Sequence, residues 1–566
     1  MRVLLALSAF LWYTSAFRIA IFIPDISKSQ AAPEKVKIAE GVHVHHVNAS
    51  NGHWAHEFVE NANEVTFEDV PLWDKRMLKR FRVFHELVQT CRNVARNSTL
   101  LDHVKSLQFD VAFTHMYSYC NIGLIHAAGI PSWIWLNSAP MTDNIANAIG
   151  LPAPPSYCPP LMMDAGENMT FVERMKSTIG FVFAPIFSKL RVADKESEIF
   201  REVYGEDFPS LHDLSKRSPL IMINSNELYE MARPTLHKVI NISGIGIDFN
   251  VDSSKLSEKY KAMIESSPQG FIVFTFGSIA PSHLMPESWK ASFLHVFSSL
   301  PQTRFFIRYE KEDEWTRSLP SNVHVSAWLP QTDLLLHDKC RGLITHGGYN
   351  SLQDAFHAGV PVLTIPLFGD QYKNGHLAAR LGVGMKLRKD QIGENTHLLS
   401  AVERLLHDES LAKKAKELRR MIDLRPVSSE HLLVKWTEFA AQFKELDNLI
   451  PFGIHLNTFV YYSIDMPMCS LCMRSLLRSV SCKACGDDQN DSMSGTWTTL
   501  LQLGIIVVWC LVCIAVFYHF AKLYRESIRA EREESWVARR HNLFSLRNDR
   551  ICVNGELEES ESWVTV

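Results

Sequence analysis

The sequence predicts an α/β fold with two doubly wound domains, and three stretches carry this prediction. Residues 271–276 and 342–344 have the pattern of short buried strands, and each is followed by a glycine-containing turn and then by a helical pattern. Gly359 and Pro361 end the second of these helices before another buried strand begins at Val362. Short apolar strands that alternate with helices are typical of parallel sheets covered on both faces.

Further strand and helix patterns along the chain divide into two expected domains, at residues 17–245 and 246–450. The other strands are predicted at 17–23, 109–113, 130–136, 220–223, 305–307 and 362–365. The helices of the second domain are predicted at 287–300, 349–357, 371–381, 398–424 and 430–446.

Residues 342–371 place a turn and a polar pair beside the predicted second sheet. The turn 346–348 follows a strand, and the helix that starts at Tyr349 leaves its first N–H groups free to face an anion. Asp370 and Gln371 follow the next strand, at the edge where open α/β sheets bind ligands. This stretch therefore predicts a phosphate site with two polar side chains beside it.

Composition indicates a large globular protein with at least two domains. The chain has 566 residues, of which 46% are hydrophobic and 21% are charged, and its formal charge is −4. Such a balanced charge does not fit a nucleic-acid-binding protein. The expected partners are small molecules and a membrane.

Both ends of the chain predict passage through the secretory pathway. Residues 1–16 have the pattern of a cleaved signal peptide, and 497–520 form an apolar run long enough to cross a bilayer. Arginines and a lysine follow this run, so the positive-inside tendency places the tail, 521–566, in the cytosol. The remainder would then be luminal in a single-pass type I membrane protein. Its N-x-[ST] sequons lie at Asn48, Asn97, Asn168, Asn241 and Asn490.

A cysteine tetrad lies in the luminal segment 451–496 that precedes the predicted anchor. It consists of Cys469, Cys472, Cys482 and Cys485, whereas Cys91, Cys120, Cys158 and Cys340 are scattered. The spacing fits a structural zinc site, but disulfides are an at least equal alternative in an oxidising lumen. Neither alternative bears on catalysis.

The stretch from Trp328 to Gln371 resembles the donor-binding signature of the UDP-glycosyltransferases. The shared motifs are WLPQ at 328–331, THGG at 345–348, GVP at 359–361 and PLFGDQ at 366–371. The chain resembles in particular the animal UDP-glucuronosyltransferases of nematodes, from Val42 to about Asp465. The resemblance implies a GT-B type fold, in which two Rossmann-like domains face each other. The first would bind the acceptor and the second the UDP-sugar, and the last helix, 430–446, would pack back on the first domain.

The resemblance also implies individual roles in binding the nucleotide. Trp328 would stack on uracil, and Gln331 would lie beside the base and the ribose. Ser278, His346 and Gly348 would meet the diphosphate.

Other matching positions concern the sugar and the ribose. Asp370 and Gln371 would hold sugar hydroxyls. Asp354 stands where the family usually has a glutamate for the ribose hydroxyls, which implies somewhat lower ribose affinity. Arg308 matches an arginine near the nucleotide, with a surface charge at a strand end as the alternative.

Two polar residues at the start of the helix allow two interpretations. Asn350 and Ser351 are candidate UDP-sugar contacts, but Asn and Ser at this position are also common helix caps. The apolar stretch 161–186 is equally ambiguous. It would be either a wall of the acceptor pocket or a flap that leans on the membrane.

The first domain departs from its relatives where the catalytic base is expected. About one α/β unit is missing around 24–41, which a shortened variant or a defective gene model would explain. Gln30 occupies the position of the usual histidine base, and His115 occupies that of the aspartate that orients it. We therefore expect His115 to be the base, with a merely structural histidine as the alternative; His53 and His56 are poorer candidates.

The function implied by the resemblance is inverting transfer of glucuronate, or of glucose, from a UDP-sugar to a hydroxyl of a small lipophilic acceptor. The UDP-sugar is a co-substrate, and neither a cofactor nor a metal is expected. The alternative is a catalytically silent UDP-sugar-binding or regulatory subunit, which the missing α/β unit favours. Residence in the endoplasmic reticulum rests on the resemblance alone, and homo- or hetero-oligomerisation stays open.

Overall fold

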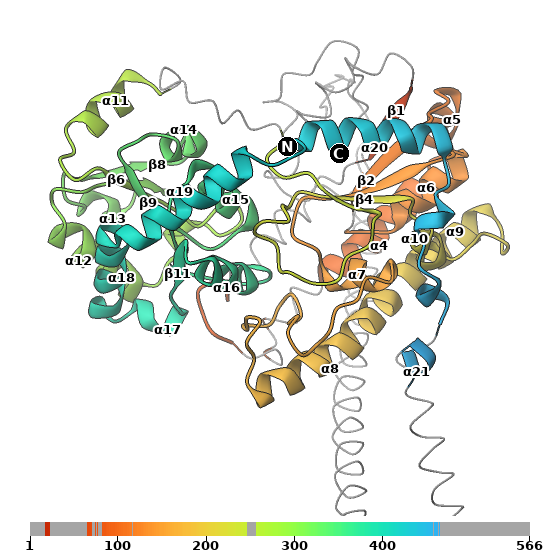
Figure 1. The fold of residues 1–566 in the computed structure, drawn as a ribbon, viewed down its shortest axis with the longest axis horizontal. Helices are drawn as coiled ribbons and strands as arrows, with labels where there is room; N and C mark the ends of the chain where they lie inside the picture. The colour runs from red at the N-terminus through yellow and green to blue at the C-terminus, as the bar shows by residue number, and fades with distance from the viewer. Residues whose placement is uncertain are drawn as a thin grey trace, which may run out of the picture. The chain divides into compact units, whose positions relative to one another are not determined.

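The computed structural model describes residues 17–22, 65–70, 74, 76, 82–115, 117–245, 256–456, 458–461 and 463. The described strands form two parallel sheets, which confirms the predicted α/β class (Figure 1). Both sheets belong to the compact unit Met1–His455, whereas α21 (Thr458–Tyr461) belongs to a second unit.

The second sheet has the order of a doubly wound fold. Its strands run β11-β10-β9-β6-β7-β8, so the chain moves outward from β6 to β8 and then returns to the other side of β6. Their bounds are β6 Phe271–Thr275, β7 Arg304–Arg308, β8 Val323–Ser326, β9 Cys340–Thr345, β10 Val362–Thr364 and β11 Gly384–Lys386. The reversal falls between β6 and β9, whose ends Thr275 and Thr345 are paired in register.

Helices cover both faces of this sheet, and the alternation of side chains along β6 explains why. Phe271 and Val273 pack in one cluster with α15 and α19, whereas Ile272 and Phe274 pack in another with α12 and α18 (Figure 1). Full burial of each such side chain contributes roughly 1.5–3 kcal/mol. The helices are α12 (Glu287–Ser299), α15 (Tyr349–Ala358), α18 (Asn395–His407) and α19 (Glu409–Asp423).

The first sheet is also parallel, and its described strands follow one another in sequence order. They are β1 Ile19–Phe22, β2 Val111–His115, β3 Trp133–Asn137, β4 Leu220–Ile223 and β5 Val239–Asn241. No reversal of strand order occurs among the described strands, so the doubly wound arrangement of this domain stays a prediction.

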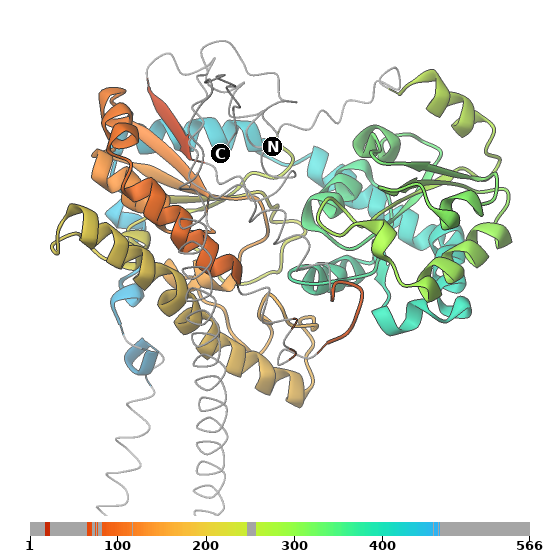
Figure 2. The same cartoon turned by 180° about the vertical axis from the view of Figure 1, so that it is seen from behind.

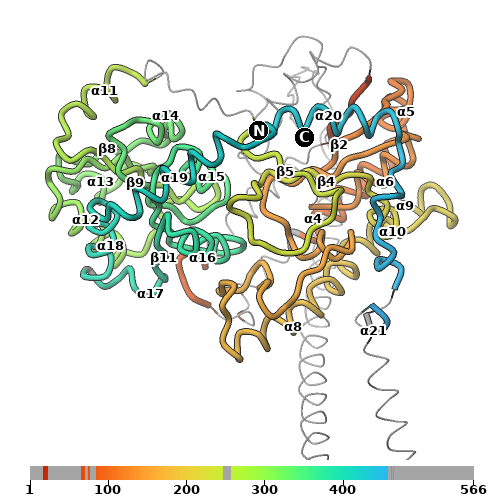
Figure 3. The backbone as a smooth tube through the Cα atoms, in the orientation of Figure 1, coloured from red at the N-terminus to blue at the C-terminus, as the bar shows by residue number. Residues whose placement is uncertain are grey.

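A helix from the end of the compact unit completes the first sheet. Helix α20 (Ser429–Phe443) lies beside β2 and β3 (Figure 3). Its Leu433 and Ala440 pack in one cluster with Val111, Ile134 and other residues of β2 to β4. The expected return of the last helix to the first domain is therefore confirmed.

On the other face, a disulfide joins two helices that pack together with α9 (Asp194–Tyr204). Cys91 of α4 (Arg82–Ala95) is bonded to Cys120 of α6 (Cys120–Ala128), and α4 lies beside α9 (Figure 2). The sequence had left these two cysteines unpaired. Their pairing depends on helix packing, which spacing along the chain does not reveal.

Several predictions fall on residues that the structure does not describe. They concern the signal peptide 1–16, the stretch 24–41, the cysteine tetrad and the anchor at 497–520. Within the described residues, no helix combines the length and apolar character that crossing a bilayer requires.

Removal of the disulfide should destabilise the first sheet and its helices. The bond closes a loop of 29 residues, so the double variant Cys91→Ala/Cys120→Ala should lose about 2–4 kcal/mol of unfolding free energy in urea titrations. Cys158→Ser, at a free buried cysteine, provides the control for loss of a thiol. Peptide mapping without reductant that found free thiols at both positions would contradict the pairing.

Candidate active site

The carboxyl ends of β6 and β9 form the centre of the candidate site. His346 lies between two glycines, because a Cβ atom at Gly277 would be 2.5 Å from its ring and one at Gly348 only 2.4 Å away. Gly277 also has a φ of +77°, which side-chain-bearing residues rarely adopt. Ser278, the next residue, is partly exposed. The two loops of the strand reversal therefore meet at one imidazole.

Helix α15 begins directly beside this histidine. Gly348 is its N-cap residue and provides no side-chain cap, so the first N–H groups of the helix remain available to an anion. Thr345 Oγ1 lies 3.1 Å from His346 Nδ1 and orients the ring. Burial, and secondarily the Arg308 guanidinium, lowers the pKa of His346 to about 4. At neutral pH the ring is uncharged and can donate one N–H to a phosphate oxygen.

Arg308, the last residue of β7, contacts the loops that follow β6 and β8. Its guanidinium donates to the carbonyl oxygens of Gly277 and Ala327, and it stacks on the Trp328 ring with 5.0 Å between Cζ and the ring centroid. The side chain is only 14% exposed, so the alternative of a surface charge is wrong. Trp328 itself is 66% exposed. Arg308 thus supports an accessible flat ring next to the phosphate loops.

Three residues predicted to contact the UDP-sugar form a connected group. Gln331 starts α14 (Gln331–Leu335), and its amide donates to Asp354 Oδ2 at 2.9 Å and to Ser351 Oγ at 3.4 Å. Ser351 and Asp354 are three residues apart on α15 and therefore share one of its faces. Asp354 is almost fully buried. The structure brings these three predicted residues together.

Asn374, which the sequence analysis missed, links Asp370 of the predicted sugar-binding pair to the loop that follows β9. Asn374 of α16 (Gln371–Leu381) donates to Asp370 Oδ2 at 2.8 Å and to the Gly347 carbonyl at 3.0 Å. Burial raises the pKa of Asp370 despite this bond. Gln371 is 3% exposed, and its Oε1 accepts from the backbone of residues 367 and 368. Gln371 therefore shapes the loop, whereas Asp370 is the better placed to meet a ligand.

Asn350 faces a segment that follows β4 in the first sheet. Its Oδ1 accepts a hydrogen bond of 3.4 Å from Asn224, and the neighbouring Tyr349 hydroxyl lies 2.5 Å from Ser225 Oγ. Gln353 of α15 donates to the Asn224 carbonyl. Asn350 is therefore part of a junction between the two halves of the compact unit, and its predicted contact with a UDP-sugar stays a prediction.

His115 ends β2 of the first sheet. Its Nε2 lies 3.2 Å from Ser138 Oγ, and its ring stacks on Tyr117 with 4.2 Å between centroids. Burial lowers the pKa of His115 to about 4, so the ring is neutral at physiological pH. Gln30, the residue at the other position of the expected dyad, lies outside the described residues.

In the first sheet, a protein carboxyl group occupies the place that corresponds to the anion site. Helix α6 follows β2 as α15 follows β9, but Glu196 of α9 accepts from the Tyr119 N–H at 2.8 Å and from Ser118 Oγ at 2.7 Å. Glu196 is fully buried, and burial raises its pKa to about 8. The amino end of α6 is therefore filled, whereas among the described residues Gly348 provides no side-chain cap for α15.

Comparisons with known proteins found one family model, several similar sequences and solved structures of low similarity. Residues 19–486 match the family model described as "UDP-glucoronosyl and UDP-glucosyl transferase". "Putative UDP-glucuronosyltransferase ugt-48" of Caenorhabditis elegans is 30% identical over 67% of this chain and 72% of its own length. "UDP-glucosyltransferase 2" of Dactylopius coccus is 26% identical over 71% of this chain and 77% of its own. The solved structure of CalG4, the calicheamicin glycosyltransferase, is 17% identical and covers 77% of this chain and 93% of that chain, with a TM-score of 0.47.

Loss of the Arg308 guanidinium should weaken UDP binding. In Arg308→Gln both the cation–π contact and the support of Gly277 are removed, so the dissociation constant measured by calorimetry should rise about tenfold, which corresponds to roughly 1.4 kcal/mol. Arg304→Gln, at the opposite end of β7, is the matched control and should leave binding unchanged. Equal affinities for Arg308→Gln and the wild type would exclude this role for Arg308.

Proposed function

Because this chain belongs to the UDP-glucoronosyl and UDP-glucosyl transferase family, we propose that it moves a hexosyl group from a UDP-sugar to a hydroxyl of a small lipophilic acceptor. The sugar would be glucuronate or glucose, and its anomeric carbon would invert. The observation that carries the proposal is the strand reversal between β6 and β9, where His346, the free end of α15 and the Arg308–Trp328 pair converge.

In the proposed reaction, the second sheet stabilises the leaving group. The acceptor oxygen attacks the anomeric carbon, and the bond from that carbon to the diphosphate oxygen breaks. Negative charge then develops on UDP, next to the N–H groups of α15 and the neutral His346 ring. Asp370 would hold the sugar through its hydroxyls, in an orientation that Asn374 fixes.

The proton of the acceptor hydroxyl would pass to a ring nitrogen of His115. A pKa of about 4 keeps this nitrogen unprotonated at neutral pH, as a base requires, but it also makes the base weak. This weakness is the observation that favours the second candidate, a silent UDP-sugar-binding subunit. The two candidates share the donor site and differ only in the proton acceptor.

We further propose that the protein is a single-pass type I membrane protein whose catalytic part lies in the lumen of the endoplasmic reticulum. The Cys91–Cys120 disulfide supports an oxidising compartment, because disulfides are rare in cytosolic proteins. Protease treatment of sealed microsomes tests the orientation. Digestion of the body with protection of the short tail would contradict it.

The pH profile and a single substitution should identify the base. If His115 must be unprotonated, kcat/KM should fall as the pH drops through about 4, whereas an unshifted histidine would give a fall near 6.5. His115→Ala should reduce turnover by roughly 10²–10⁴-fold and leave the affinity for UDP within about twofold.

His126→Ala, at another histidine of the first half whose pKa burial lowers, is the matched control and should keep full turnover. Unchanged turnover in His115→Ala would exclude His115 as the base. A wild-type protein that binds UDP but transfers to no acceptor would identify the silent subunit.

A further inference from the structure

One face of helix α16 carries three basic side chains, and among the described residues acidic groups contact only two of them. Lys373, His376 and Arg380 are spaced three and four residues apart, so they lie on the same side of the helix. This side faces a segment of the first half of the chain that precedes α8 (Phe171–Ser188).

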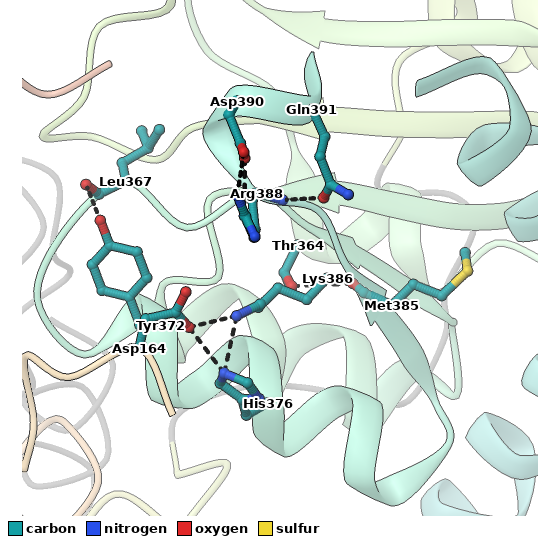
Figure 4. A network of polar contacts seen from close by, with 10 residues as sticks. All are labelled: Asp164, Thr364, Leu367, Tyr372, His376, Met385, Lys386, Arg388, Asp390 and Gln391. Atoms are coloured by element: carbon teal, nitrogen blue, oxygen red, sulfur yellow. Dashed lines mark hydrogen bonds and ion pairs between the residues drawn. The ribbon is translucent and has the colours of Figure 1, made fainter. Parts of the chain in front are cut away.

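The first of the two satisfied side chains belongs to a compact ionic cluster. His376 Nε2 lies 2.9 Å from Asp164 Oδ1, and Lys386 of β11 contacts both of them (Figure 4). Burial alone would raise the pKa of Asp164, but the hydrogen bonds from His376 and Lys386 lower it to about 2. Asp164 is therefore an anion at any physiological pH, and its partners are His376 and Lys386.

The second satisfied side chain is Arg380. Its Nη1 lies 2.8 Å from Glu167 Oε1, and its Nη2 donates to the Glu230 carbonyl at 3.1 Å. A Cβ atom at Gly166 would be 3.2 Å from His376 Nδ1, so the backbone of this segment approaches the helix closely. The position of α16 is thus fixed over two turns.

Lys373, one turn nearer the start of the helix, differs from both. It is only 6% exposed, yet within the part of the chain that the structure describes its ammonium has neither a hydrogen bond nor an ion pair. A buried cation without a partner is costly, and proteins normally pair such groups. Among the described residues, Lys373 is therefore the basic side chain of this helix face that no carboxylate contacts.

Lys373 lies near Asp370, the residue at the start of this helix that is proposed to hold the sugar. Lys373 is close enough to Asp370 to lower the pKa of that carboxyl, against the larger opposite effect of burial. Asp370 itself is bonded to Asn374. Asp143 and Glu167, like Lys373, affect the pKa of the nearby Cys158 thiol. Both carboxylates already have partners: Asp143 accepts from the Leu161 N–H, and Glu167 pairs with Arg380.

We propose that Lys373 recognises a carboxylate on the donor sugar, which makes the donor a UDP-uronate such as UDP-glucuronate and not a UDP-linked neutral hexose. The inference rests on the proposed function, in which Asp370 holds the sugar. Asp370 would accept hydrogen bonds from sugar hydroxyls that glucose and glucuronate share, and Lys373 would distinguish the two by charge. A carboxylate on the acceptor is the other source of the same chemistry.

Binding measurements without any acceptor separate these sources. Calorimetry of the full-length protein with UDP, UDP-glucose and UDP-glucuronate should show the tightest binding for UDP-glucuronate. In Lys373→Met, which keeps the length of the side chain and removes its charge, the affinity for UDP-glucuronate should fall about ten- to hundredfold. The affinities for UDP and UDP-glucose should stay within about twofold, and Lys373→Arg should retain part of the preference.

Lys389→Met is the matched control, because Lys389 is equally buried but donates to the Glu68 carbonyl. Its three affinities should keep the wild-type ratios. Equal weakening of all three ligands in Lys373→Met, or no weakening at all, would overturn the assignment, as would a wild-type preference for UDP-glucose. By contrast, a wild-type protein that bound none of the three ligands would overturn the proposed function itself.

Discussion

The reversal of strand order between β6 and β9 is the constraint on which the donor site depends. Adjacent parallel strands that diverge to opposite sides of a sheet leave a crevice at their carboxyl ends, because their following loops turn away from each other. Here the His346 ring lies so close to Gly277 and Gly348 that a side chain at either position would collide with it. Arg308 then connects the β6 loop to Trp328, so the proposed base platform and the proposed phosphate site are held in one arrangement.

The two sheets share an architecture but differ at the helix end that would bind an anion. In the first sheet Glu196 occupies the amino end of α6, next to the Cys91–Cys120 bond, whereas the amino end of α15 is open. The same local geometry therefore stabilises the fold in one half and is proposed to bind the nucleotide in the other. This difference supports, without reference to any relative, the proposed placement of the nucleotide at the second sheet.

The sequence was sufficient for the parts of the fold that depend on local pattern. Continuous apolar runs predicted β6, β9 and β10 within a few residues, and the glycine at 359 ended α15 as expected. Strands β5, β8 and β11 were missed because they are short and carry polar side chains such as His324 and Lys386. Asn374 could have been found, since it lies four residues after Asp370 on a helix. The anchoring of Glu196 and the cysteine pairing could not, because they depend on contacts between distant segments.

The location of the uracil ring tests the proposed donor site most directly. A UDP-sugar with a photoreactive azido group on uracil can be crosslinked to the full-length protein, and the labelled peptide can be identified by mass spectrometry. Labelling is expected between residues 326 and 331, around the exposed Trp328 ring, with protection by excess UDP. UDP-protected labelling within residues 17–245 would contradict it, because the nucleotide would then occupy the first sheet.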